Sequence, residues 1–339
     1  MRTGRRTRPL EGGLPTPLPS GLGTTGPIKE EVHASDTLSK HNGLKEFSIP
    51  TVTNGWESLI RLTAICWITK DLDTGGRNVG TYNGYMLGPL RSSMRSFQGH
   101  IATQWKKCRQ KGIPLQAATV LGPVPAVCMF SVTRVPYGTD ELATAGGIAG
   151  EPIEAVKCET VDIEVPASAE TVKEGEIPTD YKEPDPACGE HLGHMIINWL
   201  ANAFEIKCIT HRKNPIWHDI ISQFPPSESS VIRGIGIEER MRNFLVSGCG
   251  IAQVKDVAFH HCGGGWRFCL VRMRDLGGVR TDNFTVWQTL TAILSLSVDY
   301  PKIVIAVDED IDPWDLKSVF WAVTDNVQGT VYYHSLMIE

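Results

Sequence analysis

The chain has 339 residues, a length that suggests two domains or one large one with a substantial buried core. Its 41% hydrophobic and 21% charged residues are typical of an ordinary globular protein. The net charge of −5 argues against nucleic-acid binding through a basic surface, and no apolar run approaches the ~20 residues that span a bilayer. Nine cysteines without a Cys-x-x-Cys pair argue against a disulfide scaffold or a zinc ribbon and favour a reducing, cytoplasmic compartment.

The first 46 residues predict a disordered lead-in. Residues 1–27 contain six glycines and five prolines, and four arginines precede the first acid, Glu11. Such a composition buries too little apolar surface to fold by itself. The arginine-rich start also fits a weak mitochondrial signal, but the glycines and prolines disfavour the amphipathic helix of such a signal. Order is expected to begin near Phe47.

Strands are expected in the first ordered part, residues 47–226. Residues 59–69 are rich in β-forming side chains, and residues 82–87 can continue as their partner strand. The segment 71–78 between them contains the Asp and Gly of a hairpin turn. Four further stretches are strand candidates: 115–121, 153–158, 171–177 and 204–210.

Helices are expected over residues 97–111, where Lys and Arg fill the last turns, and over residues 140–145, ended by Gly146-Gly147. Residues 125–132 fit either a helix or a strand. Beyond the double proline Pro225-Pro226 the rhythm changes to an alternation that predicts an α/β layer. Its expected helices cover 227–247, 283–296 and 313–322, and its expected strands cover 252–259, 266–273 and 302–307.

Self-contained catalytic motifs are absent from the sequence, which has no phosphate-binding loop, nucleophile elbow or His-Glu-x-x-His. His191 and His194 beside Glu190 make zinc ligation conceivable, but the spacing supplies no third ligand. Asp185 and Glu190 flank Pro-Ala-Cys-Gly at the end of an acidic, proline-containing loop, residues 178–189. Two neighbouring carboxyls can hold different protonation states, one an ion and one a proton donor, although such a loop by itself is more often a solvated surface.

Five segments occur in the order and at the spacings of a known family: 69–82 (TKDLDTGGRNVGTY), 134–150 (RVPYGTDELATAGGIAG), 156–175 (VKCETVDIEVPASAETVKEG), 210–228 (THRKNPIWHDIISQFPPSE) and 302–322 (KIVIAVDEDIDPWDLKSVFWA). Together they resemble the UbiD family of decarboxylases, which use prenylated FMN. The resemblance runs from about Phe47 to the C-terminus. It implies an α+β fold, with a split β-barrel flavin-binding domain over 47–226 and a partial α/β oligomerisation domain over 227–339.

The resemblance also implies a metal site. In the family an Asn, a His and a Glu bind a divalent metal, usually manganese, that bridges to the flavin phosphate, and a potassium ion commonly lies nearby. The matching positions here are Asn78, His100 and Glu141. An amide, an imidazole and a carboxylate suit a borderline-hard cation. Positions that match the family's cofactor contacts are Thr81, Tyr82, Asn83, Arg95, Gly99 and His100.

The family's catalytic set is an Arg that ends the N-V-G-x-Y-R motif and two acids spaced E-x-x-x-x-E. Here Asn83 stands at the Arg position, Asp185 is the first acid and Glu190 the second. The resemblance implies that the second acid, Glu190, is the proton donor. An amide cannot grip a carboxylate through two charged hydrogen bonds, so either Arg91 or Arg134 holds the substrate or the site is impaired.

The activity implied by the resemblance is non-oxidative decarboxylation of an aromatic or α,β-unsaturated carboxylic acid. Implied partners are a second copy of the chain, as a homodimer or higher oligomer, and a flavin prenyltransferase that supplies the cofactor. Two alternatives remain open: a degenerate relative that binds flavin without turnover, and an incomplete gene product. An incomplete gene product is considered because family members usually carry an N-terminal α/β segment of about a hundred residues and a longer C-terminal tail. Candidates for the pocket lining are Tyr82, Met86, Cys188 and His191.

Overall fold

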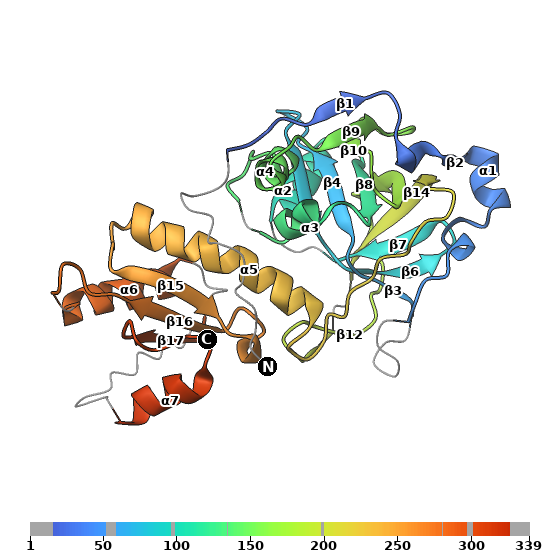
Figure 1. Ribbon diagram of the computed structural model, residues 1–339. Helices are drawn as coiled ribbons and strands as arrows, with labels where there is room; N and C mark the ends of the chain where they lie inside the picture. Colours follow the sequence, from blue (N-terminus) through green and yellow to red (C-terminus); the bar gives the residue numbers. More distant parts are fainter. Residues whose placement is uncertain are drawn as a thin grey trace. The chain divides into compact units, whose positions relative to one another are not determined.

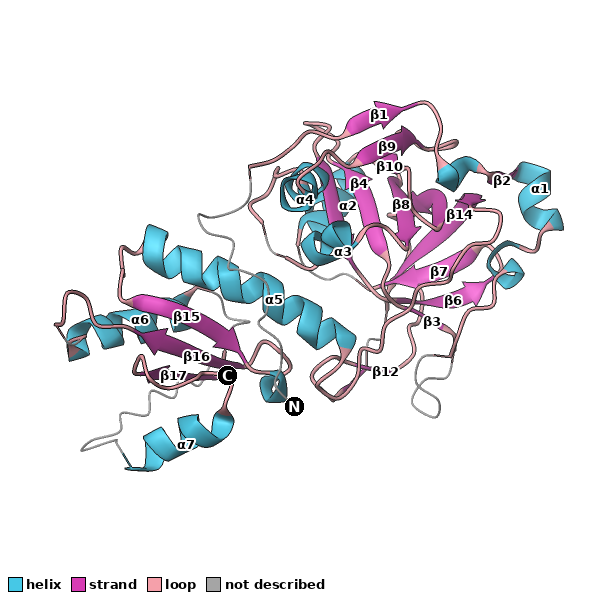
Figure 2. Cartoon of the chain, viewed as in Figure 1, coloured by secondary structure: helices cyan, strands magenta, loops and turns pink. Residues whose placement is uncertain are grey.

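The structure is a computed structural model that describes residues 16–51, 59–95, 99–133, 135–197, 200–279, 281–296 and 301–325. Its contacts divide the chain into two compact units. The first unit holds the described residues up to Gly236, and the second holds those from Ile237 onward. Helix α5 (Glu228–Asn243) contains this division, and the predicted boundary at Pro225-Pro226 lies just before it. Both units mix helices and strands (Figure 2).

A curled antiparallel sheet forms the centre of the first unit (Figure 1). Its strands are β2 (Glu31–Ala34), β3 (Arg61–Leu62), β4 (Cys66–Lys70), β5 (Arg77–Thr81), β6 (Gly84–Gly88), β7 (Arg91–Met94), β8 (Leu115–Leu121), β11 (Thr171–Ile177) and β14 (Asn202–His211). They lie in the order β3-β6-β7-β14-β11-β8-β4-β5, and β2 pairs with β14. The expected α+β fold with a half-barrel sheet is confirmed.

Alternating side chains give this sheet two apolar faces, because successive residues of a strand point to opposite sides. On β4, Cys66 and Ile68 belong to one core, and Trp67 between them belongs to the other. Helices cover both faces of the sheet. The first core includes α3 (Pro125–Ser131) and α4 (Glu141–Ala149), and the second includes α1 (Ser35–Lys40) and α2 (His100–Gln110).

The predicted end of α4 at Gly146-Gly147 is wrong. The helix continues to Ala149 and ends at Gly150, whose φ of 79° is the left-handed conformation that glycine adopts at helix ends. At Gly146 there is little space for a side chain, because a Cβ there would lie 3.0 Å from the carbonyl oxygen of Glu151. Its glycine therefore permits close packing of the helix rather than stopping it.

The hairpin partner of β4 is β5, not residues 82–87 as predicted, and β8 pairs with the other edge of β4. The turn is tighter than expected because the Asp71 carboxylate accepts hydrogen bonds from the backbone N–H groups of Asp73 and Thr74. Gly75, with a φ of 69°, completes the reversal. Residues 82–87 instead lead into β6, which pairs with β3 and β7.

The prediction of a disordered lead-in is wrong for residues 16–46. Strand β1 (Gly21–Gly23) pairs with β9 (Glu154–Lys157), which also pairs with β10 (Glu164–Pro166), and β2 joins the main sheet. The short helices η1 (Pro27–Lys29) and η2 (Gly43–Glu46) bury Ile28 and Leu44 completely. The glycine- and proline-rich composition concealed these apolar anchors. Residues 1–15 of the predicted lead-in lie outside the described residues.

The second unit contains a three-stranded sheet with helices, as the alternating pattern predicted. Its elements from the division onward are η3 (Phe244–Gly248), β15 (Val254–Phe259), η4 (His261–Gly263), β16 (Phe268–Met273), α6 (Asn283–Ser295), β17 (Ile303–Val307) and α7 (Leu316–Asp325). Strand β16 pairs antiparallel with β15 and parallel with β17, and α6 makes the crossover between the parallel strands.

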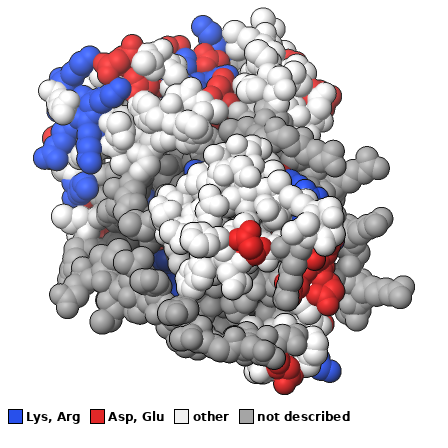
Figure 3. All heavy atoms as spheres, turned by 90° about the vertical axis from the view of Figure 1, so that its left-hand side faces the viewer, with Lys and Arg blue, Asp and Glu red and all other residues white. Residues whose placement is uncertain are grey.

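This unit exposes large apolar side chains. Phe284 of α6, Ile303 of β17 and Trp321 of α7 are 89%, 55% and 52% exposed. In Figure 3, which views the molecule from the side of α6 and α7, the described surface at the centre is largely uncharged. None of the described helices combines the length and the apolar character that crossing a membrane requires.

Candidate active site

A cavity of about 160 Å³ opens in the first unit. Its wall combines residues that are far apart in the sequence, from the β5–β6 connection, the end of β7, the acidic loop and the start of α5. The cavity also contacts His191, which was a candidate lining residue, and His218. Five of the predicted site residues line it: Thr81, Tyr82, Asn83, Arg95 and Glu190.

Two of the three predicted metal ligands meet directly. His100 begins α2 and Glu141 begins α4, and the imidazole Nδ1 lies 3.5 Å from Glu141 Oε1. The other carboxylate oxygen of Glu141 accepts a hydrogen bond of 3.1 Å from the backbone N–H of Val79. Asn78, the third predicted ligand, is the neighbouring residue on β5 and is also buried.

Asp140 fixes the start of α4 and thereby the position of Glu141. Its carboxylate accepts hydrogen bonds from the backbone N–H groups of Leu142 and Ala143 at 3.0 and 3.2 Å. The second carboxylate oxygen pairs with the Arg77 guanidinium at 2.5 Å. An aspartate at this position satisfies N–H groups that lack partners at a helix start. The cap thus fixes the backbone immediately before Glu141, a predicted metal ligand.

Asp185 and Arg95 form a buried ion pair beside the cavity. The Asp185 carboxylate accepts hydrogen bonds from Arg95 Nε and, at 2.9 Å, from Ser93 Oγ. The same guanidinium donates to the Pro186 carbonyl and to Cys188 Sγ. Arg95 is therefore enclosed by the acidic loop. The sequence predicts the two carboxyls of this loop but not its contacts with Arg95.

Glu190 is held by a histidine in the next position. Strands β12 (Cys188–Gly189) and β13 (Met195–Ile196) form a small hairpin, and Glu190 and His191 follow its first strand. His191 Nδ1 lies 3.0 Å from Glu190 Oε2. Burial raises the pKa of Glu190, but the hydrogen bond to His191 and the charges of His191 and Arg61 outweigh it. The net effect is a pKa below the usual glutamate value.

Arg61 is the functional neighbour that sequence reasoning missed. It lies on β3, is 1% exposed and donates a 2.7 Å hydrogen bond to the carbonyl of Gly189. A buried arginine needs partners, so a lone arginine in the apolar stretch Leu-Ile-Arg-Leu was the available signal. It supports the backbone immediately before Glu190.

Of the other predicted residues, Arg91 lies apart from this group, whereas Cys188 Sγ accepts a hydrogen bond from Arg95. Arg91 pairs with Glu183 and Tyr181 rather than lining the cavity, and Arg134 lies outside the described residues. Burial raises the pKa of the Cys188 thiol, against the charges of Arg61 and Arg95. His194 is exposed, and among the described residues it belongs to no group of three metal-ligating side chains with His191.

Asn83 and Arg95 are neighbours across two strand ends. The backbone N–H of Arg95 donates a 3.0 Å hydrogen bond to the Asn83 carbonyl, and both residues line the cavity. A guanidinium therefore reaches the cavity next to the position where the motif lacks its arginine.

Comparisons with known proteins agree with this architecture. Residues 23–225 match the 3-octaprenyl-4-hydroxybenzoate carboxy-lyase Rift-related domain, and residues 235–331 match the C-terminal domain of the same carboxy-lyase. A protein of Archaeoglobus fulgidus is 30% identical over 271 residues, which cover 76% of this chain and 52% of that protein. The chain thus spans about half the length of this relative.

Solved structures of UbiD-class enzymes superpose on most of the chain. An evolved dimeric form of HmfF from Pelotomaculum thermopropionicum, in complex with prFMN, is 28% identical with a TM-score of 0.84, over 92% of this chain and 70% of that one. Vanillic acid decarboxylase of Sedimentibacter hydroxybenzoicus is 26% identical with a TM-score of 0.78, over 92% and 64%. With both domain matches and these shared folds, the chain belongs to the UbiD family of carboxy-lyases.

Proposed function

We propose that the chain is a carboxy-lyase that removes CO2, without oxidation, from an aromatic or α,β-unsaturated carboxylic acid, with prenylated FMN as its cofactor. The observation that carries the proposal is the cavity, which joins a guanidinium, Arg95, to a histidine-held carboxylate, Glu190. The first can hold a carboxylate and the second can transfer a proton. Family membership and the prFMN bound to the similar HmfF structure support the choice of cofactor.

Asn78, His100 and Glu141 would hold a divalent metal such as Mn²⁺ against the flavin phosphate, with K⁺ nearby. Their donor atoms fit this use: an amide oxygen, an imidazole nitrogen and a carboxylate oxygen. Glu141 is buried, and within the described residues no lysine or arginine forms an ion pair with it. A buried carboxylate without a basic partner other than His100 favours the uptake of a cation.

Arg95 would take the role of the arginine that position 83 lacks. A guanidinium has five N–H donors, and three hydrogen bonds hold Arg95 to the acidic loop, so donors remain for a substrate carboxylate. Asp185 acts here as a positioning residue, because it fixes the guanidinium. Asn83 would then support Arg95 through its backbone carbonyl instead of binding the substrate.

Glu190 would return a proton to the substrate carbon. When bound, prenylated FMN supplies an electron-accepting ring that stabilises the negative charge left on carbon as CO2 departs. The lowered pKa makes Glu190 an anion at neutral pH, so it must first receive a proton. His191, at 3.0 Å, can provide it. The carbon–carboxylate bond breaks, a carbon–hydrogen bond forms, and His191 recovers its proton from water.

The proposal includes assembly as a homodimer or higher oligomer, and a flavin prenyltransferase as the source of cofactor. The exposed apolar side chains of the second unit, such as Phe284 and Trp321, support self-association. Size-exclusion chromatography with light scattering tests it: a dimer or larger species is expected, and a monomer at high concentration contradicts it.

The test of activity is to express the chain together with a flavin prenyltransferase and measure CO2 release from cinnamic, hydroxybenzoic and heteroaromatic acids. Turnover of at least one class is expected, and Arg95→Lys should lower kcat/KM because Lys cannot make the paired hydrogen bonds of Arg. Arg91→Lys is the matched control, since Arg91 does not line the cavity. Protein that holds the cofactor but releases no CO2 from the panel would contradict the proposal.

A catalytically degenerate flavin-binding protein is the second candidate. It is favoured by Asn83 and by Asp185, the two departures from the family's catalytic set. Asn83→Arg separates the two functions. An inert wild type that gains turnover with this substitution supports degeneracy, whereas robust turnover by the wild type excludes it.

A further inference from the structure

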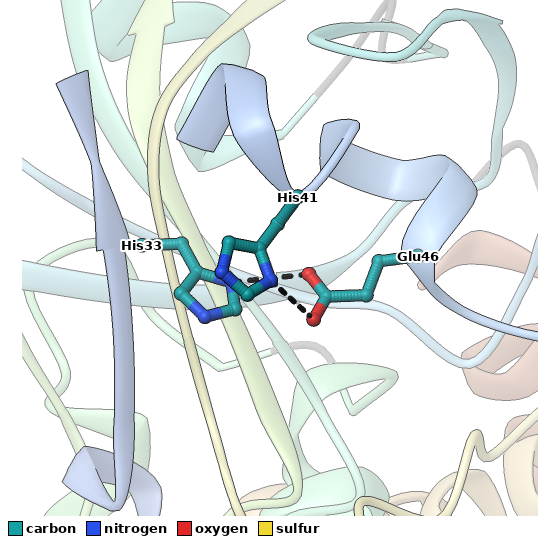
Figure 4. A group of neighbouring side chains, drawn as sticks. All are labelled: His33, His41 and Glu46. Atoms are coloured by element: carbon teal, nitrogen blue, oxygen red, sulfur yellow. Dashed lines mark hydrogen bonds and ion pairs between the residues drawn. The ribbon is translucent and has the colours of Figure 1, made fainter. Parts of the chain in front are cut away.

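Three histidines and a glutamate gather on elements that the proposed activity does not use: His33, His41, His211 and Glu46. None of them lines the cavity. We propose that this group, named here the histidine cluster, is a second metal site that binds a transition-metal dication, with Zn²⁺ the best fit. Figure 4 shows His33 and His41 directed at the Glu46 carboxylate.

The fold brings the cluster together from four elements. His33 on β2 pairs with Ile209 of β14, and His211 lies two residues further along β14, so both imidazoles share one face of the sheet. His41 follows the last residue of α1, and Glu46 is the last residue of η2. Asn42, with a φ of 63°, turns the chain between these two helices.

The distances fit coordination. His33 Nδ1 lies 3.0 Å from Glu46 Oε2, and His41 Nδ1 lies 3.2 Å from Glu46 Oε1. The ligand atoms of these three residues all lie within 4.8 Å of one another. Donors bonded at ~2.0–2.1 Å to a tetrahedral zinc stand about 3.3 Å apart. The ligand atoms are thus close enough for coordination once the stacked rings of His33 and His41, with centroids 3.7 Å apart, turn toward a common ion.

His211 provides the independent observation that a ligand belongs here. The residue is 4% exposed, and its Nδ1 hydrogen-bonds the Arg212 carbonyl at 2.6 Å, which leaves the lone pair on Nε2. Nε2 is buried, has no hydrogen-bond partner among the described residues, and lies 3.8 Å from Glu46 Oε1. A metal-ligating histidine commonly has this form, with one nitrogen on a backbone carbonyl and the other on the metal.

The donor set selects the ion. Three imidazoles and one carboxylate suit zinc, copper or nickel, and a hard cation such as Mg²⁺ prefers oxygen donors throughout. His211 lies just outside the compact group of the other three, so it would have to turn toward the ion; four protein ligands would then complete a tetrahedral shell, which is typical of structural rather than catalytic zinc. Bound zinc would join β2, α1 and η2 to β14. It would thus clamp the N-terminal segment onto the main sheet.

The experiment uses the full chain, stripped with a chelator and then titrated with Zn²⁺ or Co²⁺ alone. We expect zinc to bind at the histidine cluster, and His41→Ala to lower affinity by ~100-fold or more, since even supporting residues of metal sites contribute 10–100-fold. His41 is half-exposed, so its loss should not disturb folding. The control is His194→Ala, another exposed histidine, which should bind zinc like the wild type.

Cobalt distinguishes this site from the others. A four-coordinate Co²⁺ spectrum without thiolate charge-transfer bands is expected, and it should persist in His100→Ala, which removes a ligand of the proposed manganese site. Glu46→Gln can still hydrogen-bond both histidines but lacks the charge, so it should weaken metal binding while leaving the apo-protein folded. Zinc stoichiometry and cobalt spectra that are the same in His41→Ala, Glu46→Gln and wild type would overturn the proposal.

Discussion

The candidate active site has two ends, a predicted metal end around Asn78, His100 and Glu141 and an acid end around Asp185 and Glu190. Their buried carboxylates differ in how their charges are paired. At the predicted metal end, the partners of the Glu141 carboxylate among the described residues are His100 and a backbone N–H. At the acid end, Asp185 is paired with Arg95, and Glu190 with His191. The first end has negative charge to offer a cation, whereas the second has already balanced its charges. A site that binds a metal-linked cofactor and an anionic substrate needs both conditions.

This difference bears on the departures from the family motif. The metal end retains all three matching residues, Asn78, His100 and Glu141. The acid end departs at Asn83 and at Asp185, yet the shorter acid still meets a guanidinium because Arg95 comes from the neighbouring strand end. The ion pair is thus preserved from a different position, which supports an intact rather than an impaired site.

The largest expected effect is on the acid end. Glu190→Gln removes the proposed proton donor and keeps the size of the side chain, so kcat should fall by about 10²–10⁴-fold. Cofactor binding, followed by the flavin absorbance, should stay unchanged. Asp180→Asn, which changes a carboxyl that is outside the cavity, is the control. Wild-type kcat in Glu190→Gln would remove Glu190 from the mechanism.

The His191 partner should set the pH profile of that step. Because His191 lowers the pKa of Glu190, His191→Asn should raise it. His191 nevertheless supplies the proton in the proposed step, and a glutamate by itself ordinarily loses its proton at lower pH than a histidine does, so the alkaline limb of the rate profile should move to lower pH. A limb that stays in place would show that another group titrates there.

The metal end gives the next largest effect. Glu141→Gln removes the charge that faces His100, and Mn²⁺ affinity should fall by ~100-fold. Metal analysis and retention of prenylated FMN after gel filtration measure it. The same substitution at Glu309, a half-exposed residue of the second unit that pairs with Lys255 at 2.7 Å, should leave both unchanged.

The two ends of the site can be predicted from the sequence to different extents. The predicted metal ligands lie in short motifs whose order along the chain matches the family, so the sequence can propose them as a set. Arg95 and Arg61 act through long-range contacts with the acidic loop, and spacing in the sequence cannot show which arginine meets which acid. The same limit explains the N-terminal error, because a glycine- and proline-rich composition does not reveal that β2 pairs with β14. Propensity describes local preference, and pairing is decided by tertiary contacts.

Lys173, a buried lysine outside the candidate active site, provides a further test of how burial acts on an ionisable group. Burial lowers the pKa of Lys173 to about 7, although the charge of Asp219 partly opposes it. Between pH 7 and 10 the unfolded chain therefore binds more protons than the folded one, and stability should rise with pH by up to ~1.4 kcal/mol per unit. Denaturant unfolding should show this rise in the wild type but not in Lys173→Met.

Lys207 supplies the matched control for that measurement. It lies on the adjacent β14, is half-exposed and pairs with Glu176. Lys207→Met should therefore keep the pH-dependent rise of the wild type. A flat profile in the wild type, or an equal rise in Lys173→Met, would show that Lys173 does not titrate in this range.

The smallest expected effect tests how rigidly the metal end is built. Asp140→Ala removes the cap of α4 and should cost about 1 kcal/mol of stability, read as a fall of a few degrees in Tm. Asp140→Asn keeps a capping oxygen but not the charge that pairs with Arg77, so it should cost less. Because Glu141 follows the cap directly, Mn²⁺ affinity should fall with Tm in the alanine variant and hold in the asparagine variant. Equal metal affinity in all three proteins would mean that contacts of Glu141 itself, such as the Val79 N–H, position the ligand without help from the cap.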